Sequence, residues 1–298
     1  MRAADNNKEE RDPMPAALAA PEGDVDALIR SIVVPPRPAL LAEVQAEIDA
    51  DDPDVGRIAQ LIGRDVALTA GVLRSVNSPF FALSRKAGSL AEAIALLGLR
   101  RVGALVTGFA LRQAVQGDRA QLTRFWDVSG KRSYALARLA AGLRGVAPDT
   151  AQSFGLFCDV GIALLMQRFA HYGATLKAAN QAKTQSFTEV EQAAHQTDHS
   201  FVGALVARAW GLPKPVCEAI RLHHDYTIFH DPAVDEGVQR MVAMGLLAEL
   251  AIQRFAGLNQ SLEWTKGGEQ AIGLLMLTEH EIQDWIDTLL DGFAAGVS

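Results

Sequence analysis

The feature that most constrains the fold of this chain is a series of segments with apolar residues at helical spacing, most of them opened by a helix-capping residue. Asp52 followed by Pro53 predicts the start of one helix, which ends at Gly63. Asp65 predicts the start of the next. No stretch alternates polar and apolar residues with the period of two that a half-buried strand requires. The chain is therefore predicted to be all-α.

Later helices follow the same rules. Three S/T-x-x-E patterns predict capping boxes: Ser89 with Glu92, Ser186 with Glu189, and Thr278 with Glu281. Residues 154–169 and residues 241–255 are each predicted to form one helix. The last box precedes an apolar stripe: Ile282, Trp285, Ile286 and Leu289. We expect this stripe to pack on its own domain rather than on a partner helix.

The overall composition excludes global disorder and makes nucleic acid an improbable partner. Apolar residues make up 49% of the 298 residues, which is enough to bury a large core. The net charge is −7, whereas a general nucleic-acid binder is basic. Arg100, Arg101 and Arg112 could form a local basic patch, but we favour a solvated helix face.

The two cysteines and the N-terminus indicate a cytoplasmic protein. Cys158 and Cys217 have no CxxC spacing and lie in apolar stretches, so we expect buried thiols in a reducing compartment. A nucleophilic role for Cys158 would need an activating base, which the sequence does not show. The N-terminus has no apolar secretory core, and no stretch reaches about 18 uninterrupted apolar residues, so no membrane association is predicted.

Two long blocks of sequence resemble the HDOD family. In residues 52–102, DVALTAGVLRSVNS matches the family's D-P-x-L-x-x-x-L-L-x-x-x-N-S, with Val66 in place of proline. Residues 89–98 match its S-x-x-x-A-I-x-x-L-G. Residues 198–225 contain a histidine that opens a helix, then W-G-L-P and a His-His pair, as in the family's C-terminal signature. The resemblance runs from about residue 32 to about residue 229.

This resemblance implies an N-terminal helical subdomain and a C-terminal subdomain related to the HD and HD-GYP phosphohydrolases, which include enzymes that hydrolyse cyclic di-GMP. We therefore divide the chain into a flexible tail at 1–24, an N-terminal helical half at 25–118 and a degenerate HD-like half at 119–230. A C-terminal helical extension at 231–298 is expected to pack on the HD-like half.

HD chemistry needs a metal held by a histidine, an adjacent His-Asp pair and a later aspartate. On the resemblance, these positions are Val128, the pair Cys158 and Asp159, and Gly245. Ile162 replaces a lysine that often follows. One ligand of four remains, and a single carboxylate holds a catalytic divalent cation poorly. We therefore predict no catalytic residue, no metal and no cofactor.

The polar residues that remain are Asp159, His199, His223 and His224. The resemblance places His199 and His224 at positions that serve metal or phosphate in relatives with two metals. For the histidines we favour hydrogen bonds between helices over ligand binding. For Asp159 we favour a structural role with nearby backbone. His195, four residues before His199, is interpreted as a chance neighbour, because Thr197 and Asp198 should break the helix between them.

The resemblance implies a regulatory role, so the leading hypothesis is a non-enzymatic signal-transduction module of bacteria that acts as a protein-binding scaffold. Its expected partners are signalling proteins, such as a kinase, a cyclase or a regulator, with a nucleotide messenger as a weaker alternative and a link to cyclic di-GMP signalling. The first rival is a metal-dependent phosphohydrolase with rearranged ligands. The second is a DNA-binding regulator, against which the acidic charge argues.

Overall fold

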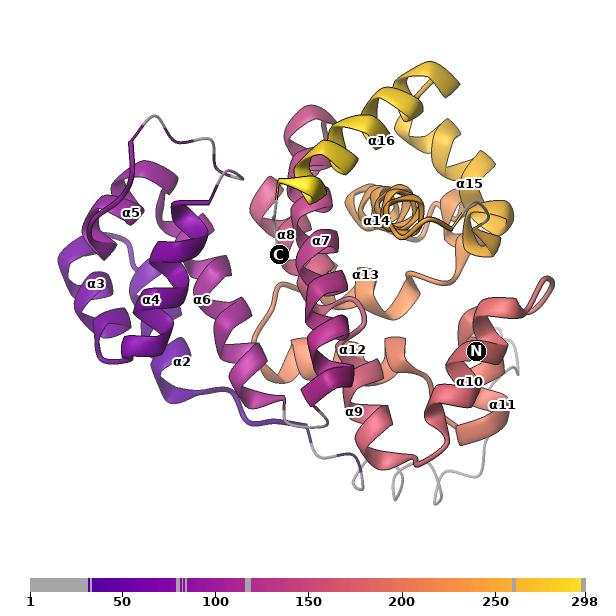
Figure 1. The fold of residues 1–298 in the computed structure, drawn as a ribbon, viewed down its shortest axis with the longest axis horizontal. Coiled ribbons are helices and arrows are strands. Elements are labelled where there is room, and N and C mark those ends of the chain that lie inside the picture. Colours follow the sequence, from indigo (N-terminus) through magenta and orange to yellow (C-terminus); the bar gives the residue numbers. More distant parts are fainter. Residues whose placement is uncertain are drawn as a thin grey trace, which may run out of the picture. The chain divides into compact units, whose positions relative to one another are not determined.

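The computed structural model of the chain describes Ile32, residues 34–78, Phe81, Leu83, and residues 85–115, 119–258 and 261–295. All regular structure in these residues is helical, which confirms the predicted all-α fold (Figure 1). The expected tail at 1–24 lies outside the described residues. Residues 33–298 form one compact unit, and the boundaries at residues 118 and 230 stay predictions.

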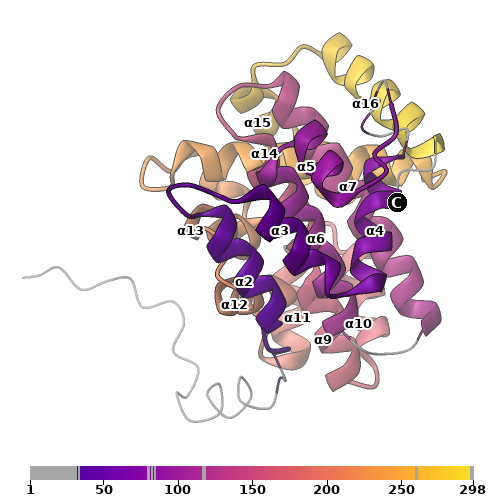
Figure 2. The same cartoon turned by 90° about the vertical axis from the view of Figure 1, so that its left-hand side faces the viewer.

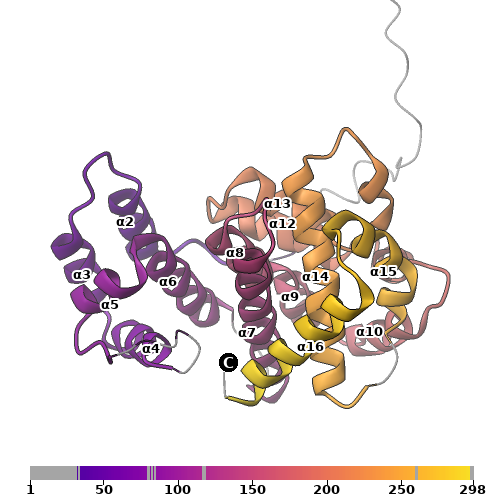
Figure 3. The ribbon, with the colours of Figure 1, turned by 90° about the horizontal axis from the view of Figure 1, so that it is seen from above.

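The first group of helices packs around α6. It contains α2 (Ala39–Ile48), α3 (Val55–Gly63), α4 (Val66–Val76), α5 (Leu90–Leu97) and α6 (Leu99–Ala114). α6 contacts α2, α4 and α5, and it also contacts a later helix, α8 (Pro148–Phe157). Figures 2 and 3 show this group on one side of the molecule. Its core is aliphatic, with Val72, Val106 and Leu111 fully buried.

The second group follows and is built around a long helix. Its members are α7 (Arg119–Gly142), α8 (Pro148–Phe157), α9 (Val160–Arg168), α10 (Tyr172–Gln181), α11 (Phe187–His195), α12 (His199–Ala209), α13 (Lys214–Leu222) and the 3₁₀ helix η2 (Tyr226–His230). α7 packs along α8, and α12 packs on both α9 and α13.

The last three helices close the structure. They are α14 (Glu236–Phe255), α15 (Leu262–Leu275) and α16 (Glu279–Ala294). α14 contacts α7 and α13, while α16 lies against α7 and α14. Ile286 and Leu289 of the last stripe are fully buried, so the stripe packs on its own domain as predicted. No helix of the described residues is long and apolar enough to cross a membrane.

Several helix starts follow the sequence, and others do not. Asp65 caps α4, and the boxes at Ser186 and Thr278 form with both of their hydrogen bonds. Ser89 caps α5, but its box is incomplete, because Glu92 turns to the backbone N–H of Gly88. The prediction of a cap at Asp52 is wrong. Asp54 caps α3 instead, because its carboxylate reaches the N–H of Arg57.

Candidate functional site

One cavity of about 800 Å³ brings together every site position that the sequence singled out. Its walls include residues of α7, α8, α9, α10, α11, α12, α14, α15 and η2 and of the segment after α13. The seven positions are Val128, Cys158, Asp159, His199, His223, His224 and Gly245. They come from segments far apart in the sequence, which the tertiary fold brings together. Exposed histidines at 171, 230 and 280 take no part.

Asp159 lies at a break between two helices. The prediction of one helix over residues 154–169 is wrong, because α8 ends at Phe157 and α9 begins at Val160. α9 also crosses α12 closely: a Cβ atom on Gly161 would lie 2.1 Å from the carbonyl oxygen of His199. This crossing is a tertiary contact, which an apolar pattern in one segment cannot reveal.

The charge of Asp159 is balanced by a buried arginine. Arg132 Nη1 lies 2.7 Å from Asp159 Oδ2, and Arg132 Nη2 lies 2.6 Å from Glu249 Oε2. Burial by itself would raise the pKa of the Asp159 carboxyl, but Arg132, with His223 and His199, holds it well below its ordinary value. The main partner of Asp159 is therefore the side chain of Arg132 and not the nearby backbone that we expected, and a structural role for Asp159 stays a prediction.

The sequence interpretation missed Arg132 and Glu249. Arg132 follows Val128 by four residues on α7, and Glu249 follows Gly245 by four residues on α14. Residues four apart share one helix face, so both side chains point to the cavity that Val128 and Gly245 line. This spacing was visible in the sequence. That Arg132 pairs with a residue from another helix was not.

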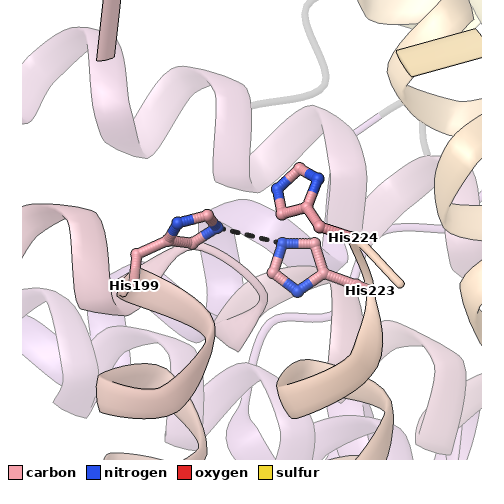
Figure 4. Close-up of side chains that lie close together, drawn as sticks. All are labelled: His199, His223 and His224. Carbon is pink, nitrogen blue, oxygen red and sulfur yellow. Dashed lines mark hydrogen bonds between the residues drawn. The ribbon is translucent and has the colours of Figure 1, made fainter. Parts of the chain in front are cut away.

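Each of the three cavity histidines has its Nδ1 atom held by an acceptor. The contacts are His199 to Glu191 Oε2 at 2.6 Å, His223 to the Ile220 carbonyl at 2.7 Å, and His224 to Glu263 Oε2 at 2.9 Å. A ring that donates from Nδ1 presents a lone pair at Nε2. The Nε2 atoms of His199 and His223 lie 3.1 Å apart (Figure 4). Two lone pairs at this distance need a proton or a cation between them.

The surroundings favour a proton on His223. Burial would lower the pKa of His223, but Cys158 and Asp159 raise it to about 9. Asp159 Oδ1 lies 3.5 Å from His223 Nε2. Burial and the neighbouring His223 lower the pKa of His224 to about 4, so this ring stays neutral. Two adjacent histidines therefore differ in charge because of their neighbours.

Cys158 and Glu191 add two features that the sequence did not show. Cys158 is buried, as expected, and its thiol lies within 4.8 Å of the titratable side chains of both His223 and Asp159. Glu191 is fully buried and accepts from the Tyr172 hydroxyl and from His199. It fixes the ring of His199 as the carboxylate of a buried pair does.

The residues at the four positions that the resemblance assigns to HD metal ligands do not by themselves form a metal site. Val128 and Gly245 carry no donor atom, and a Cβ atom on Gly245 would lie 3.1 Å from the Phe154 ring. Asp159 is paired with Arg132 instead. Donors do converge in the cavity when its histidines are included, in two sets whose atoms lie within 4.8 Å of one another: His199, His223 and His224, and Cys158, Asp159 and His223.

His195 and His199 lie on two different helices, as predicted. α11 ends at His195 and α12 begins at His199. His195 bonds to the Thr175 hydroxyl and stacks on Phe169, away from the cavity. Asp198 caps α12, which explains the break between the two histidines.

Comparison with known proteins supports the resemblance described above. A family model of the HDOD domain matches residues 34–226. The chain belongs to the HDOD family. An "Uncharacterized protein" of Treponema pallidum (strain Nichols) is 24% identical to this HDOD protein over 229 residues, which are 75% of this chain. The match covers 43% of that relative, so this chain spans less than half of its length.

Solved structures share the fold of this HDOD protein. One is a Shewanella amazonensis protein named "Putative phosphohydrolase", with 21% identity and a TM-score of 0.70 over 91% of this chain and 96% of that one. Another is a Marinobacter aquaeolei protein named "Putative signal transduction protein", with 19% identity and a TM-score of 0.68 over 92% of this chain and 63% of that one. At these identities the likeness concerns the fold alone.

Proposed function

We propose that this HDOD protein is a non-enzymatic regulatory module of bacterial signal transduction, which acts in the cytoplasm by binding signalling proteins. The observation that supports the absence of catalysis is the ion pair of Arg132 with Asp159 and Glu249. A fixed guanidinium neutralises the carboxylate that a metal would use, but it cannot bind and activate a water molecule as a metal does. Under this proposal, Arg132 balances the charge of the two carboxylates but does not replace the catalytic action of a metal.

The partners we propose are a kinase, a cyclase or a regulator, with a nucleotide messenger of cyclic-dinucleotide signalling as the other class. Support for a signalling role comes from family membership and from the name of the Marinobacter relative. Affinity purification of the tagged chain from its native cell, followed by mass spectrometry, tests this part. Recovery of metabolic enzymes in place of signalling proteins would contradict it.

The absence of catalysis has a direct test. The chain is incubated with cyclic di-GMP and with an aryl phosphodiester in manganese, iron(II) or magnesium, beside an Asp159→Asn variant whose fold is checked by circular dichroism. We expect background hydrolysis in both proteins. General-base catalysis by Asp159 alone would give about 10²–10⁴-fold, too little to detect for so slow a reaction. Metal-dependent turnover that is absent in Asp159→Asn would contradict the proposal.

A second candidate function is a metal-dependent phosphohydrolase with rearranged ligands. The observation that favours it is the convergence of His199, His223 and His224 in one cavity. Elemental analysis of the purified chain separates the two candidates. The leading proposal predicts no stoichiometric transition metal, whereas about one tightly held metal ion per chain would favour the second.

A further inference from the structure

A second cavity lies between the first and second groups of helices. Its volume is about 400 Å³, within the range of small-molecule sites. α4 and α6 form one side of it, and α7 and α8 form the other. None of the residues assigned above to the first cavity lines it. A ligand here would contact both groups of helices at once.

The charge of this cavity is opposite to that of the chain. Its lining includes Arg74 and Arg112 but no aspartate or glutamate, although the chain has a net charge of −7. Neither arginine forms a salt bridge with any described residue. Asp127 acts on Arg112 electrostatically, but its carboxylate pairs with Lys131. Two exposed guanidinium groups therefore remain available to an anion.

The rest of the lining suits a planar ring. Phe109, Trp126 and Tyr134 line the cavity, and the guanidinium of Arg112 lies over the Trp126 ring, 5.7 Å from its centroid. Gln152 also lines it. Its side chain is about nine-tenths buried and makes no hydrogen bond to a described residue. An amide in this state offers a donor and an acceptor to a polar ring edge.

We propose that this second cavity binds a nucleotide, with its phosphate at Arg74 and Arg112 and its base against the aromatic wall near Gln152. Guanidinium groups match phosphate oxygens in charge and geometry, and bases stack on aromatic side chains. The inference rests on the proposed role as a binding module, whose ligand class it names. The alternative is a site that binds any small anion, and the test below distinguishes it from a nucleotide site by comparing inorganic phosphate with nucleotides.

The test uses the full chain labelled with ¹⁵N and titrated with GMP or AMP, with guanosine and inorganic phosphate as separate arms. We expect saturable binding of a nucleotide that shifts the indole signal of Trp126, assigned with Trp126→Phe. The signals of the other three tryptophans should stay in place. Arg74→Ala and Arg112→Ala should each weaken binding about tenfold or more, as the loss of a charge-assisted contact does.

Arg101→Ala is the matched control. Arg101 lies on α6 with Arg112, is exposed and does not line the cavity, so its loss changes the net charge equally. Binding should be unchanged in this variant. Equal weakening by Arg101→Ala and Arg112→Ala would overturn the proposal, as would phosphate that binds as tightly as GMP and AMP, or no nucleotide binding up to millimolar concentrations.

The outcomes keep this inference apart from the proposed function. Metal-dependent hydrolysis lost in Asp159→Asn would contradict the non-enzymatic role, yet it would leave the effect of Arg112→Ala on nucleotide binding intact. Nucleotide binding that shifts no Trp126 signal and is insensitive to Arg74→Ala would remove the second cavity as the site. Nucleotide binding at another place in the chain would still agree with the proposed function.

Discussion

At the scale of single residues, Arg132 balances the negative charges in the main cavity. It is about 6% exposed and lies between the carboxylates of Asp159 and Glu249. A buried charge is costly unless it is paired, so the three side chains depend on one another. The same guanidinium also takes up the carboxylate that would otherwise be available to a metal.

We predict that Arg132→Ala lowers the free energy of unfolding at pH 7 by about 3–5 kcal/mol, because it leaves two carboxylates without their buried partner. Urea unfolding followed by circular dichroism measures this. The control is Arg64→Ala, which removes an exposed pair with Glu43 and should cost less than about 1 kcal/mol. Similar losses in the two variants would show that Arg132 is not essential to the site.

At the scale of elements, α7 and α14 each bring to the main cavity one position that the resemblance assigns to an HD metal ligand. Val128 and Gly245 line the same cavity, with Arg132 and Glu249 one turn further along. Restoring ligands at these positions is therefore not enough, because Arg132 still pairs with Asp159.

We predict that the triple variant with Val128→His, Cys158→His and Gly245→Asp binds manganese weakly or not at all. Adding Arg132→Gln to this triple variant should raise its affinity for manganese at least about tenfold, since each missing or blocked ligand costs that much. Isothermal titration calorimetry measures both. Gly245→Asp also requires a shift of the Phe154 ring. Tight binding by the triple variant would mean that Arg132 does not exclude the metal.

The cap of α16 gives a second prediction for an element. Thr278→Ala should lower the free energy of unfolding by about 1 kcal/mol, because a cap hydrogen bond to the N–H of Glu281 is lost. Hydrogen bonds from the backbone N–H and the hydroxyl of Thr278 lower the pKa of the Glu281 carboxyl in the folded chain. The carboxylate therefore stabilises the fold at pH values above its unfolded pKa of about 4.5. This stabilisation is lost as the pH falls through the lowered pKa of the folded chain.

Glu281→Ala should accordingly lower Tm at pH 7, and the difference from the unmodified chain should shrink below pH 4.5. Thermal unfolding at several pH values measures it. The control is Glu279→Ala. Glu279 is an acidic residue of the same helical turn, but it makes no cap contact. A Tm difference that is independent of pH would contradict this account of the cap.

At the scale of the whole molecule, Trp210 ties the segment before α2 to the second group of helices. Its indole Nε1 donates to the carbonyl of Pro35 at 2.8 Å, and its ring is fully buried against Phe157. The tryptophan of the W-G-L-P motif thus joins two parts of the chain that are 175 residues apart.

We predict that Trp210→Phe costs about 1–3 kcal/mol, because a buried carbonyl is left without its donor. Proteolysis near Pro35 should also become faster. Chemical unfolding and limited proteolysis measure the two effects. Trp285→Phe is the control, since Trp285 is only half-buried and makes no hydrogen bond to a described residue. Unchanged protection near Pro35 would show that the segment is held by other contacts.

The sequence by itself determined the helical class, the family and most helix starts, because caps such as Asp65, Ser186 and Thr278 act within one turn of the chain. It also selected seven of the residues that line the main cavity, through the resemblance. These features depend on the local spacing of residues or on the order of motifs, and both are visible in the amino-acid sequence.

Only the tertiary structure decided how those residues are used. The partner of Arg132 and the opposite pKa shifts of His223 and His224 depend on segments distant in sequence. The same is true of Cys158, whose neighbour His223 the sequence could not show. Burial, charge pairing and close helix crossings are properties of the packed chain, so no local pattern encodes them.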